Sequence, residues 1–275
     1  MYATVSQGLD FLQLLLDENV NGTYSKINTA RSALSAILIM DPSFGIQREV
    51  VWFMKGVYNL RTPKPKYVDT WNPQVILTLL KSAEWEPADS LSLKRLTLKL
   101  CMLTMLVSGQ RCEVLLKLKL DCMTLLSNGD YVFQIDTLKQ SRRGYVNPLI
   151  TLKAYPEDDR LCVVNYLSEY LKRTVNIRGD CQTVLVTFQK PHHLPSRSTI
   201  SRWISIVMSL SGINVSKYKP HSVRMASTSA ANRSGVSLDT ILAKAGWSQV
   251  STFAKFYERP LESEKGDEFA DAVLS

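Results

Sequence analysis

Apolar residues recur every three or four positions through the first sixty residues, which is the spacing of one face of an α-helix. The pattern predicts three short helices, of which the second stops at Asp41-Pro42 and the third covers residues 47–60. The apolar positions that define the three faces are Leu9, Leu12, Leu16, Val20, Ile27, Ala30, Leu34, Leu38, Val50, Phe53, Met54 and Val57.

A basic, proline-rich segment follows the third helix. Residues 61–70 read Arg-Thr-Pro-Lys-Pro-Lys-Tyr-Val-Asp-Thr, and prolines alternating with bases are typical of an extended connector. We therefore predict a helical domain over 1–62, a basic linker over 63–70, a larger domain over 71–260 and an acidic tail over 261–275. About 60 residues is small for a helical domain, which is consistent with a chain that begins inside a longer protein.

The larger domain is mostly helical by the same criterion, but its periodicity changes near the middle. Two runs rich in β-branched and aromatic residues, 131–137 and 145–152, flank a basic turn closed by Gly144, which predicts a β-hairpin. A further short strand is predicted over 183–188. The predicted fold class is therefore mainly α with a small antiparallel β-sheet (α+β). Predicted helices cover 92–107, 112–118, 160–174, 198–211, 221–233, 238–245 and 249–258.

Composition excludes several classes of protein. The 275 residues are 45% hydrophobic and 21% charged, which is typical of a folded globular chain. Lys99 interrupts the most apolar run, 96–107, so no membrane span is predicted, and the N-terminus lacks the basic region of a secretory signal. Five cysteines without a CxxC pair favour reduced thiols and an intracellular location, and three histidines make a histidine-built metal site improbable.

The charge indicates a polyanionic partner and is unevenly distributed. The chain carries a net charge of +8, which favours nucleic acid among possible partners, although many globular proteins of this charge bind none. Residues 258–275 contain six acids and two bases and so carry −4, which leaves +12 on the preceding residues. The body of the protein is therefore more basic than the whole chain.

Two segments near the C-terminus carry candidate chemistry. His221 and Arg224 are three residues apart at the start of a predicted helix, so both side chains point to one side; an exposed polar helix end explains this spacing equally well. Trp247 follows Gly246, and Tyr257 lies one helical turn after Phe253. Taken alone, the tyrosine is more simply a core aromatic residue.

Two further segments add cations in unusual places. Arg111 stands where an apolar helix breaks at Ser-Gly-Gln. A buried arginine is costly unless a bound anion or a carboxylate satisfies it. Arg111 is therefore either an anion-binding residue or one partner of a structural salt bridge. The predicted hairpin turn carries Lys139, Arg142 and Arg143, for which a solvated turn is the simpler explanation when the segment is taken alone.

Taken together, these residues resemble the tyrosine recombinase (phage integrase-like) family. The order of an arginine, a hairpin lysine, His-x-x-Arg, a tryptophan and a tyrosine near the C-terminus matches the family's pattern over residues 70–260. The segments Lys-Pro-His-Ser-Val-Arg-Met-Ala-Ser-Thr-Ser-Ala-Ala and Leu-Asp-Thr-Ile-Leu-Ala-Lys-Ala-Gly-Trp resemble the recombinases of eukaryotic DIRS/Ngaro-type retrotransposons and, less closely, Cryptons. The matched positions are Arg111, Lys139, His221, Arg224, Trp247 and Tyr257.

The resemblance implies a mechanism of DNA cleavage. Tyr257 would attack the scissile phosphate and form a 3′-phosphotyrosine, which conserves the bond energy so that rejoining needs no ATP. Arg111 and Arg224 would bind the non-bridging oxygens, and Lys139 would protonate the leaving 5′-oxygen. His221 would assist proton transfer, and Trp247 would donate a hydrogen bond to the phosphate. Cofactors, metal ions included, are not expected, because the cations supply what a metal would.

The match has one departure and one weak region. The family commonly has an acidic residue three positions after the first arginine, where this chain has Val114, and Glu113 lies one position earlier. Whether Glu113 supports the site or the role is missing stays open. The N-terminal third resembles the family's core-binding domain only in its short amphipathic helices and its bases.

The expected partners are double-stranded DNA and further copies of the chain. Four protomers would assemble on two DNA sites from monomers in solution, and the acidic tail would dock on a neighbour or remain a solvated end. The expected location is intracellular and, by resemblance, nuclear. The rival functions are a type IB topoisomerase-like nicking-closing enzyme and a catalytically retired DNA-binding protein. Candidate DNA-binding residues are Arg61, Lys64, Lys66, Arg142, Arg143, Arg197 and Arg202.

Overall fold

The computed structural model describes residues 3–18, 22–135, 147 and 149–262, and these form two compact units that meet between Lys66 and Tyr67. This division falls inside the range 63–70 that the sequence indicates as a linker. Each unit has its own buried cluster of apolar side chains. None of the helices in this part of the chain combines the length and the apolar character that crossing a membrane requires.

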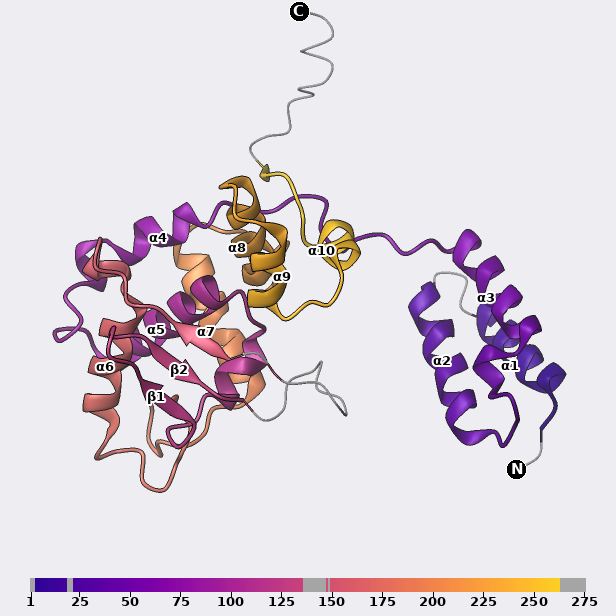
Figure 1. Ribbon diagram of the computed structural model, residues 1–275, viewed down its shortest axis with the longest axis horizontal. Coiled ribbons are helices and arrows are strands. Elements are labelled where there is room, and N and C mark those ends of the chain that lie inside the picture. Colours follow the sequence, from indigo (N-terminus) through magenta and orange to yellow (C-terminus); the bar gives the residue numbers. More distant parts are fainter. Residues whose placement is uncertain (1–2, 19–21, 136–146, 148, 263–275) are drawn as a thin grey trace, which may run out of the picture. The chain divides into compact units, whose positions relative to one another are not determined.

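The first unit is a small helical bundle. Helices α1 (Val5–Glu18), α2 (Tyr24–Ile37) and α3 (Arg48–Leu60) pack around a core built from one face of each, and the 3₁₀ helix η1 (Phe44–Ile46) closes it (Figure 1). Phe44 lies against Gly8 of α1 so closely that a Cβ there would overlap the ring. The fully or largely buried apolar side chains are Leu12, Leu16, Ile27, Leu38, Phe44, Val50, Met54 and Val57.

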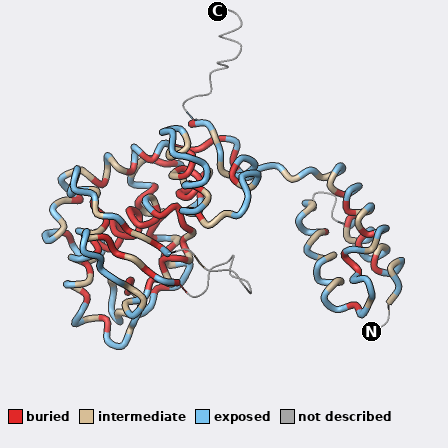
Figure 2. The backbone as a smooth tube through the Cα atoms, viewed as in Figure 1, coloured by how far each residue is buried: buried red, intermediate tan, exposed pale blue. Residues whose placement is uncertain are grey.

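The second unit is built around one buried helix, α5 (Leu93–Ser108). The Ser92 hydroxyl accepts a hydrogen bond from the backbone N–H of Arg95 at its start, and Gly109 ends it in the left-handed conformation with φ 59°. Helix α5 packs against α6 (Val163–Thr174), α7 (Arg197–Leu210) and α8 (Ser222–Arg233). Buried residues accordingly gather along α5 in the centre of this unit (Figure 2).

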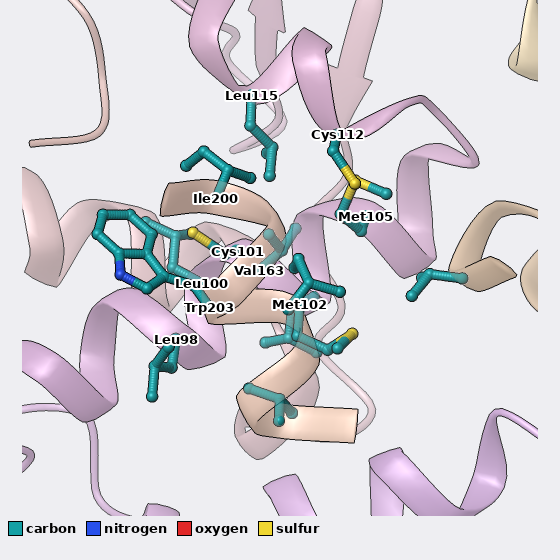
Figure 3. Close-up of a cluster of buried hydrophobic side chains, with 14 of the residues drawn as sticks. Leu98, Leu100, Cys101, Met102, Met105, Cys112, Leu115, Val163, Ile200 and Trp203 are labelled. Atoms are coloured by element: carbon teal, nitrogen blue, oxygen red, sulfur yellow. The ribbon is translucent and has the colours of Figure 1, made fainter. Parts of the chain in front are cut away.

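The core side chains around α5 come from several elements (Figure 3). Helix α5 contributes the largest share, and the 3₁₀ helix η3 (Cys112–Lys117), α6 and α7 supply the side chains that face it. The labelled residues are Leu98, Leu100, Cys101, Met102, Met105, Cys112, Leu115, Val163, Ile200 and Trp203.

A small antiparallel sheet adjoins the helices. Strands β1 (Met123–Leu125), β2 (Tyr131–Phe133) and β3 (Ile150–Leu152) lie in the order β1-β2-β3, and Val132 pairs with both Thr124 and Thr151. The predicted mainly helical α+β fold with a small antiparallel sheet is confirmed. The predicted pairing of the two β-rich runs is also present, but the strands are shorter than predicted and β1 was not predicted.

One local prediction was wrong. The helix predicted over 112–118 is present as the 3₁₀ helix η3. Residues 183–188, in contrast, form no strand, and only Thr183 bridges to Lys119. The Tyr170 hydroxyl donates to the Val186 carbonyl and accepts from its N–H, so a side chain satisfies the backbone that a neighbouring strand would otherwise pair.

The remaining elements complete the second unit. The helices of the C-terminal part begin and end within three residues of the predicted bounds, since their apolar faces are regular. The elements not yet named are α4 (Gln74–Leu80), η2 (Ala83–Trp85), η4 (Asp159–Leu161), α9 (Leu238–Ala245) and α10 (Val250–Phe256).

Lys99, the charge that interrupts the apolar run, is fully buried and tightly bonded. Its ammonium lies 2.6 Å from Glu86 Oε1, donates to the carbonyls of Leu80 and Trp85 at 2.6 and 3.0 Å, and donates to the Tyr166 hydroxyl at 2.7 Å. Burial lowers the pKa of Lys99, and the Glu86 carboxylate opposes this shift. The ion pair therefore fastens α5 to the segment before it.

We expect Glu86→Gln to lower the free energy of unfolding by about 3 kcal/mol at pH 7, because it leaves a buried cation without its counter-charge. Without Glu86, the pKa of Lys99 falls further below its value in the unfolded chain. The loss should therefore be complete below the pKa that Lys99 has in the folded variant. It should shrink as the pH rises from that pKa toward 10.5, because burying a neutral lysine costs less free energy than burying a charged one. Urea denaturation at pH 7 and pH 9.5 measures both effects.

Glu84→Gln is the matched control, because Glu84 pairs with Arg95 at 3.0 Å on the surface, where the two side chains are 74% and 45% exposed. It should cost less than about 1 kcal/mol and show no such pH dependence. Equal losses for the two variants would contradict the structural role of the buried pair.

Candidate active site

Helix α8 positions the two residues of the His-x-x-Arg motif. Arg224 is only 2% exposed, and its Nη2 donates to the Ala245 carbonyl at 2.8 Å. The Nε and Nη1 groups of Arg224 are also buried, and neither has a hydrogen-bond partner among the described residues. Burying two donor nitrogens that have no acceptor in the described part of the chain is costly, so this guanidinium can bind a further acceptor, such as an anion.

Trp247 and Tyr257 lie beside this guanidinium. The centre of the guanidinium is 4.2 Å from the Trp247 ring and 5.5 Å from the Tyr257 ring, and the two rings are 4.3 Å apart. The indole N–H of Trp247 is buried and has no partner in the described part of the chain. Three donor nitrogens without a partner among the described residues are therefore buried around the phenol of Tyr257.

Arg111 adds a second positive charge to this group. It follows directly after the break that Gly109 makes at the end of α5, and it is half-buried. Burial and then the charge of Arg111 lower the pKa of Arg224 to about 10, and Tyr257 opposes the shift. The guanidinium still carries its charge at neutral pH, so two cations share the site and favour a bound anion.

The Tyr257 backbone is held by α8 of the same chain. Its N–H donates to the Phe253 carbonyl at 2.8 Å, which ends α10, and its carbonyl accepts from the Ser229 hydroxyl. The same hydroxyl accepts from the N–H of Arg259 at 3.2 Å. One serine on the Arg224 helix thus fixes the residue that carries the phenol.

The first residues of the second unit support both sides of the site. The Tyr67 ring lies 5.5 Å from the ring of His221, which is exposed at the start of α8, and the Tyr67 carbonyl accepts from Arg259 Nε at 2.9 Å. The indole N–H of Trp71 donates to Ser222 at 3.0 Å. His221 is therefore one turn from Arg224 on the same helix, and its ring contact is with Tyr67.

The position three residues after Arg111 carries no carboxylate in this chain. Val114, which occupies the position where the family commonly has an acid, is buried among apolar side chains. Glu113 is half-buried in η3, and none of the ion pairs found among the described residues involves it.

Lys139, Arg142 and Arg143 lie outside the described residues. Of the other predicted DNA-binding residues, Lys64, Lys66, Arg197 and Arg202 are exposed. Arg61 instead donates to the carbonyls of Gly22 and Leu16 at 3.0 and 2.7 Å, so its guanidinium braces the first unit internally.

The structure adds residues that the sequence analysis missed. Lys94 and Lys190 line a cavity together with the predicted Arg202, next to the Phe188 and Trp203 rings, whose centroids are 5.2 Å apart. Lys94 lies about a hundred residues before the other two cations along the chain, so no spacing rule brings it to them. Ser229, Tyr67 and Arg259 were missed because they act through backbone groups, which side-chain patterns do not reveal.

The start of the predicted tail is bound within its own chain. Leu261 is 9% exposed and forms a parallel bridge with Thr70, which exchanges backbone hydrogen bonds with Pro260 and Glu262 at 2.9 Å each. Lys217 pairs with Asp69 at 2.6 Å and with Glu262 at 2.9 Å. Residues 263–275 lie outside the described part of the chain. Within that part, no group of three or more His, Cys, Asp or Glu residues could hold a metal ion.

Comparison with known proteins places the chain in a family. The model of the phage integrase family matches residues 72–264, most of the chain, and the protein belongs to this family. No curated protein matches it.

Solved structures of recombinases share its fold. XerH site-specific recombinase bound to a palindromic difH substrate is 14% identical, with a TM-score of 0.65 over 98% of this chain and 71% of that one. The Tn1549 transposon integrase bound to transposon right-end DNA is 12% identical, with a TM-score of 0.60 over 99% and 84%. A λ integrase tetramer bound to a Holliday junction is 17% identical, with a TM-score of 0.52 over 97% and 68%. The fold is thus that of the tyrosine recombinases.

The unpaired donors predict that the site binds a tetrahedral anion. Inorganic phosphate at tenfold over its dissociation constant should raise the free energy of unfolding by about 1.4 kcal/mol. Thermal melting at constant ionic strength measures this. Arg224→Gln should lose the increment, whereas Arg160→Gln, at an exposed arginine that pairs with Asp158, should keep it and so control for general salting-out. An increment that survives in Arg224→Gln would refute the anion site.

Proposed function

We propose that this chain is a site-specific DNA recombinase or integrase of a mobile element, which cuts and rejoins DNA through a 3′-phosphotyrosine intermediate without metal or ATP. The observation that carries the proposal is the buried Arg224 guanidinium, whose unpaired N–H groups lie beside the unpaired indole N–H of Trp247 and the phenol of Tyr257. Membership of the phage integrase family supports it.

The proposed cleavage begins with attack by the Tyr257 phenol oxygen on phosphorus. A new P–O bond forms to the tyrosine as the bond to the 5′-oxygen breaks, so the number of phosphoester bonds is unchanged and reversal needs no energy source. Arg224, Arg111 and the Trp247 N–H stabilise the charge on the non-bridging oxygens of the transition state. The guanidinium is already desolvated, so it needs no reorganisation when the phosphate arrives.

Two groups handle the protons. The phenol must lose a proton to become a good nucleophile, and His221, one turn before Arg224, is the proposed acceptor. The leaving 5′-oxygen must gain a proton, and Lys139 is the proposed donor. Glu113, two positions after Arg111, is the proposed acidic support of the site, because the position of Val114 is apolar.

Double-stranded DNA is the proposed substrate, and four protomers on two sites are the proposed assembly. XerH and the Tn1549 integrase were solved bound to DNA, and λ integrase as a tetramer on a Holliday junction. The exposed bases Lys64, Lys66, Arg197 and Arg202, together with Arg142 and Arg143, are the proposed phosphate contacts. Arg61 is left out of these contacts because its guanidinium bonds two carbonyls of the first unit.

The proposed element is a eukaryotic DIRS/Ngaro-type retrotransposon or a Crypton, on the strength of the segments around His221 and Trp247. Such an element implies a nuclear location for the enzyme. The first unit, over residues 1–62, is the proposed DNA clamp that pairs with the catalytic domain over 71–260.

We expect the wild-type protein to form a covalent adduct with duplex DNA that carries the terminal sequences of the element and a nick next to the cleavage site. The nick lets the short fragment diffuse away and traps the intermediate, which a denaturing gel resolves. Tyr257→Phe should abolish the adduct but keep DNA affinity, and Arg224→Ala should slow its formation by about 10²–10³-fold. Tyr131→Phe, a tyrosine of the sheet, is the matched control and should leave the adduct unchanged.

An adduct that persists in Tyr257→Phe would refute the nucleophile. No adduct with the wild type, together with intact DNA binding, would favour a catalytically retired DNA-binding protein.

We further expect two protomers to bind each recombination site and two such sites to pair. Gel-shift titration and light scattering on the same DNA should then give complexes of two and four chains. A type IB topoisomerase-like enzyme would instead relax supercoiled plasmid as a one-to-one complex, and that result would contradict recombination while preserving the tyrosine chemistry.

A further inference from the structure

The last turn of α9 leaves four carbonyl groups that no following helical N–H can reach, and the structure accounts for all of them. Gly246 turns the chain in the left-handed conformation with φ 68°, so its N–H reaches the Ala243 carbonyl at 3.2 Å and that of Trp247 reaches the Leu242 carbonyl at 2.9 Å. The carbonyls of Lys244 and Ala245 accept from side chains of two other elements.

Those two side chains come from the segments that carry the arginines. Gln110 Nε2 donates to the Lys244 carbonyl at 2.6 Å, and Arg224 Nη2 donates to the Ala245 carbonyl at 2.8 Å. Gln110 directly precedes Arg111 in the chain. Adjacent carbonyls of a single helix end therefore hold the loop that carries Arg111 and the guanidinium of Arg224, while the residues that cap this end lead into Trp247.

Burying the amide of Gln110 at this position costs free energy. It is 1% exposed, and its Oε1 is buried with no partner among the described residues. A buried, unsatisfied carbonyl oxygen costs about 1–3 kcal/mol, so an apolar side chain of similar volume would pack more cheaply. The amide forms a directed hydrogen bond from the Arg111 loop to the end of α9, which an apolar side chain could not form.

We propose that Gln110 is a positioning residue that sets Arg111 at the correct distance from Arg224 by fastening the Arg111 loop to the Lys244 carbonyl. This inference rests on the proposed recombinase function and deepens it. Two like charges repel each other, and the charge of Arg111 accordingly lowers the pKa of Arg224, so the bond from Gln110 helps to keep the Arg111 loop beside Arg224 before a phosphate neutralises the pair.

The test is Gln110→Met, which keeps the length of the side chain and removes its donor. The rate of adduct formation in a single turnover should fall about 10- to 100-fold, because a small displacement of a catalytic group has an effect of that size. The dissociation constant for DNA should change less than about twofold, since Gln110 itself contacts no substrate. Nicked duplex with the element's ends serves for both measurements.

A double-mutant cycle distinguishes positioning from general destabilisation. If Gln110 acts only through Arg111, adding Gln110→Met to Arg111→Lys should slow the reaction by less than about threefold beyond Arg111→Lys alone. Thr97→Val is the matched control, because Thr97 is fully buried in α5 and bonds the Leu93 carbonyl away from the site. It should lower the melting temperature without lowering the cleavage rate.

Full additivity of the Gln110 and Arg111 substitutions would overturn the proposal, as would a wild-type rate in Gln110→Met. Both results require a wild-type protein that forms the adduct, so they leave the proposed function standing. A wild type that forms no adduct would instead reject the proposed function, and the positioning role with it.

Discussion

The structure of the second unit depends on burying one guanidinium that is only partly hydrogen-bonded among the described residues. Arg224 is buried against two aromatic rings and bonded to a single carbonyl, although a carboxylate partner would satisfy it more fully. Such an arrangement costs free energy that the core of the unit must offset, and the Phe133, Tyr170 and Ile204 side chains show how completely that core is closed. The unsatisfied N–H groups are the feature on which the proposed function depends, because an incoming phosphate would meet donors already in place.

A second constraint is that the phenol must be held as rigidly as the cations. Tyr257 ends a helix of only seven residues, which is too short to be stable alone. Its position is instead fixed by bonds from Ser229 and from the pairing of Thr70 with residues 260–262. The segment that enters the second unit and the segment that follows Tyr257 therefore stabilise each other, and the ion pairs of Lys217 with Asp69 and Glu262 lie beside them.

The sequence predicted the fold class and the helices of the C-terminal part, because regular apolar faces are local signals. It also indicated that His221 and Arg224 share a helix, and the structure brings Arg224, Trp247 and Tyr257 together. The strand predicted over 183–188 was wrong, because separate groups satisfy the backbone of this run, among them the Tyr170 hydroxyl at Val186 and the Arg178 guanidinium at the Thr183 and Val184 carbonyls. The tether formed by Gln110 could not be predicted, because its partner is a backbone carbonyl 134 residues away.

The structure also changes what the net charge of the chain indicates about its partner. A charge of +8 indicates a polyanionic partner only if the cations face it, yet several bases in this chain serve its own backbone. Lys99 binds two carbonyls inside the core, and Arg61 binds two more in the first unit. Arg259, two residues after Tyr257, binds the Tyr67 carbonyl. Basic residues therefore divide into those that bond the protein's own backbone and those that remain exposed for a polyanionic partner, and only the three-dimensional structure separates the two groups.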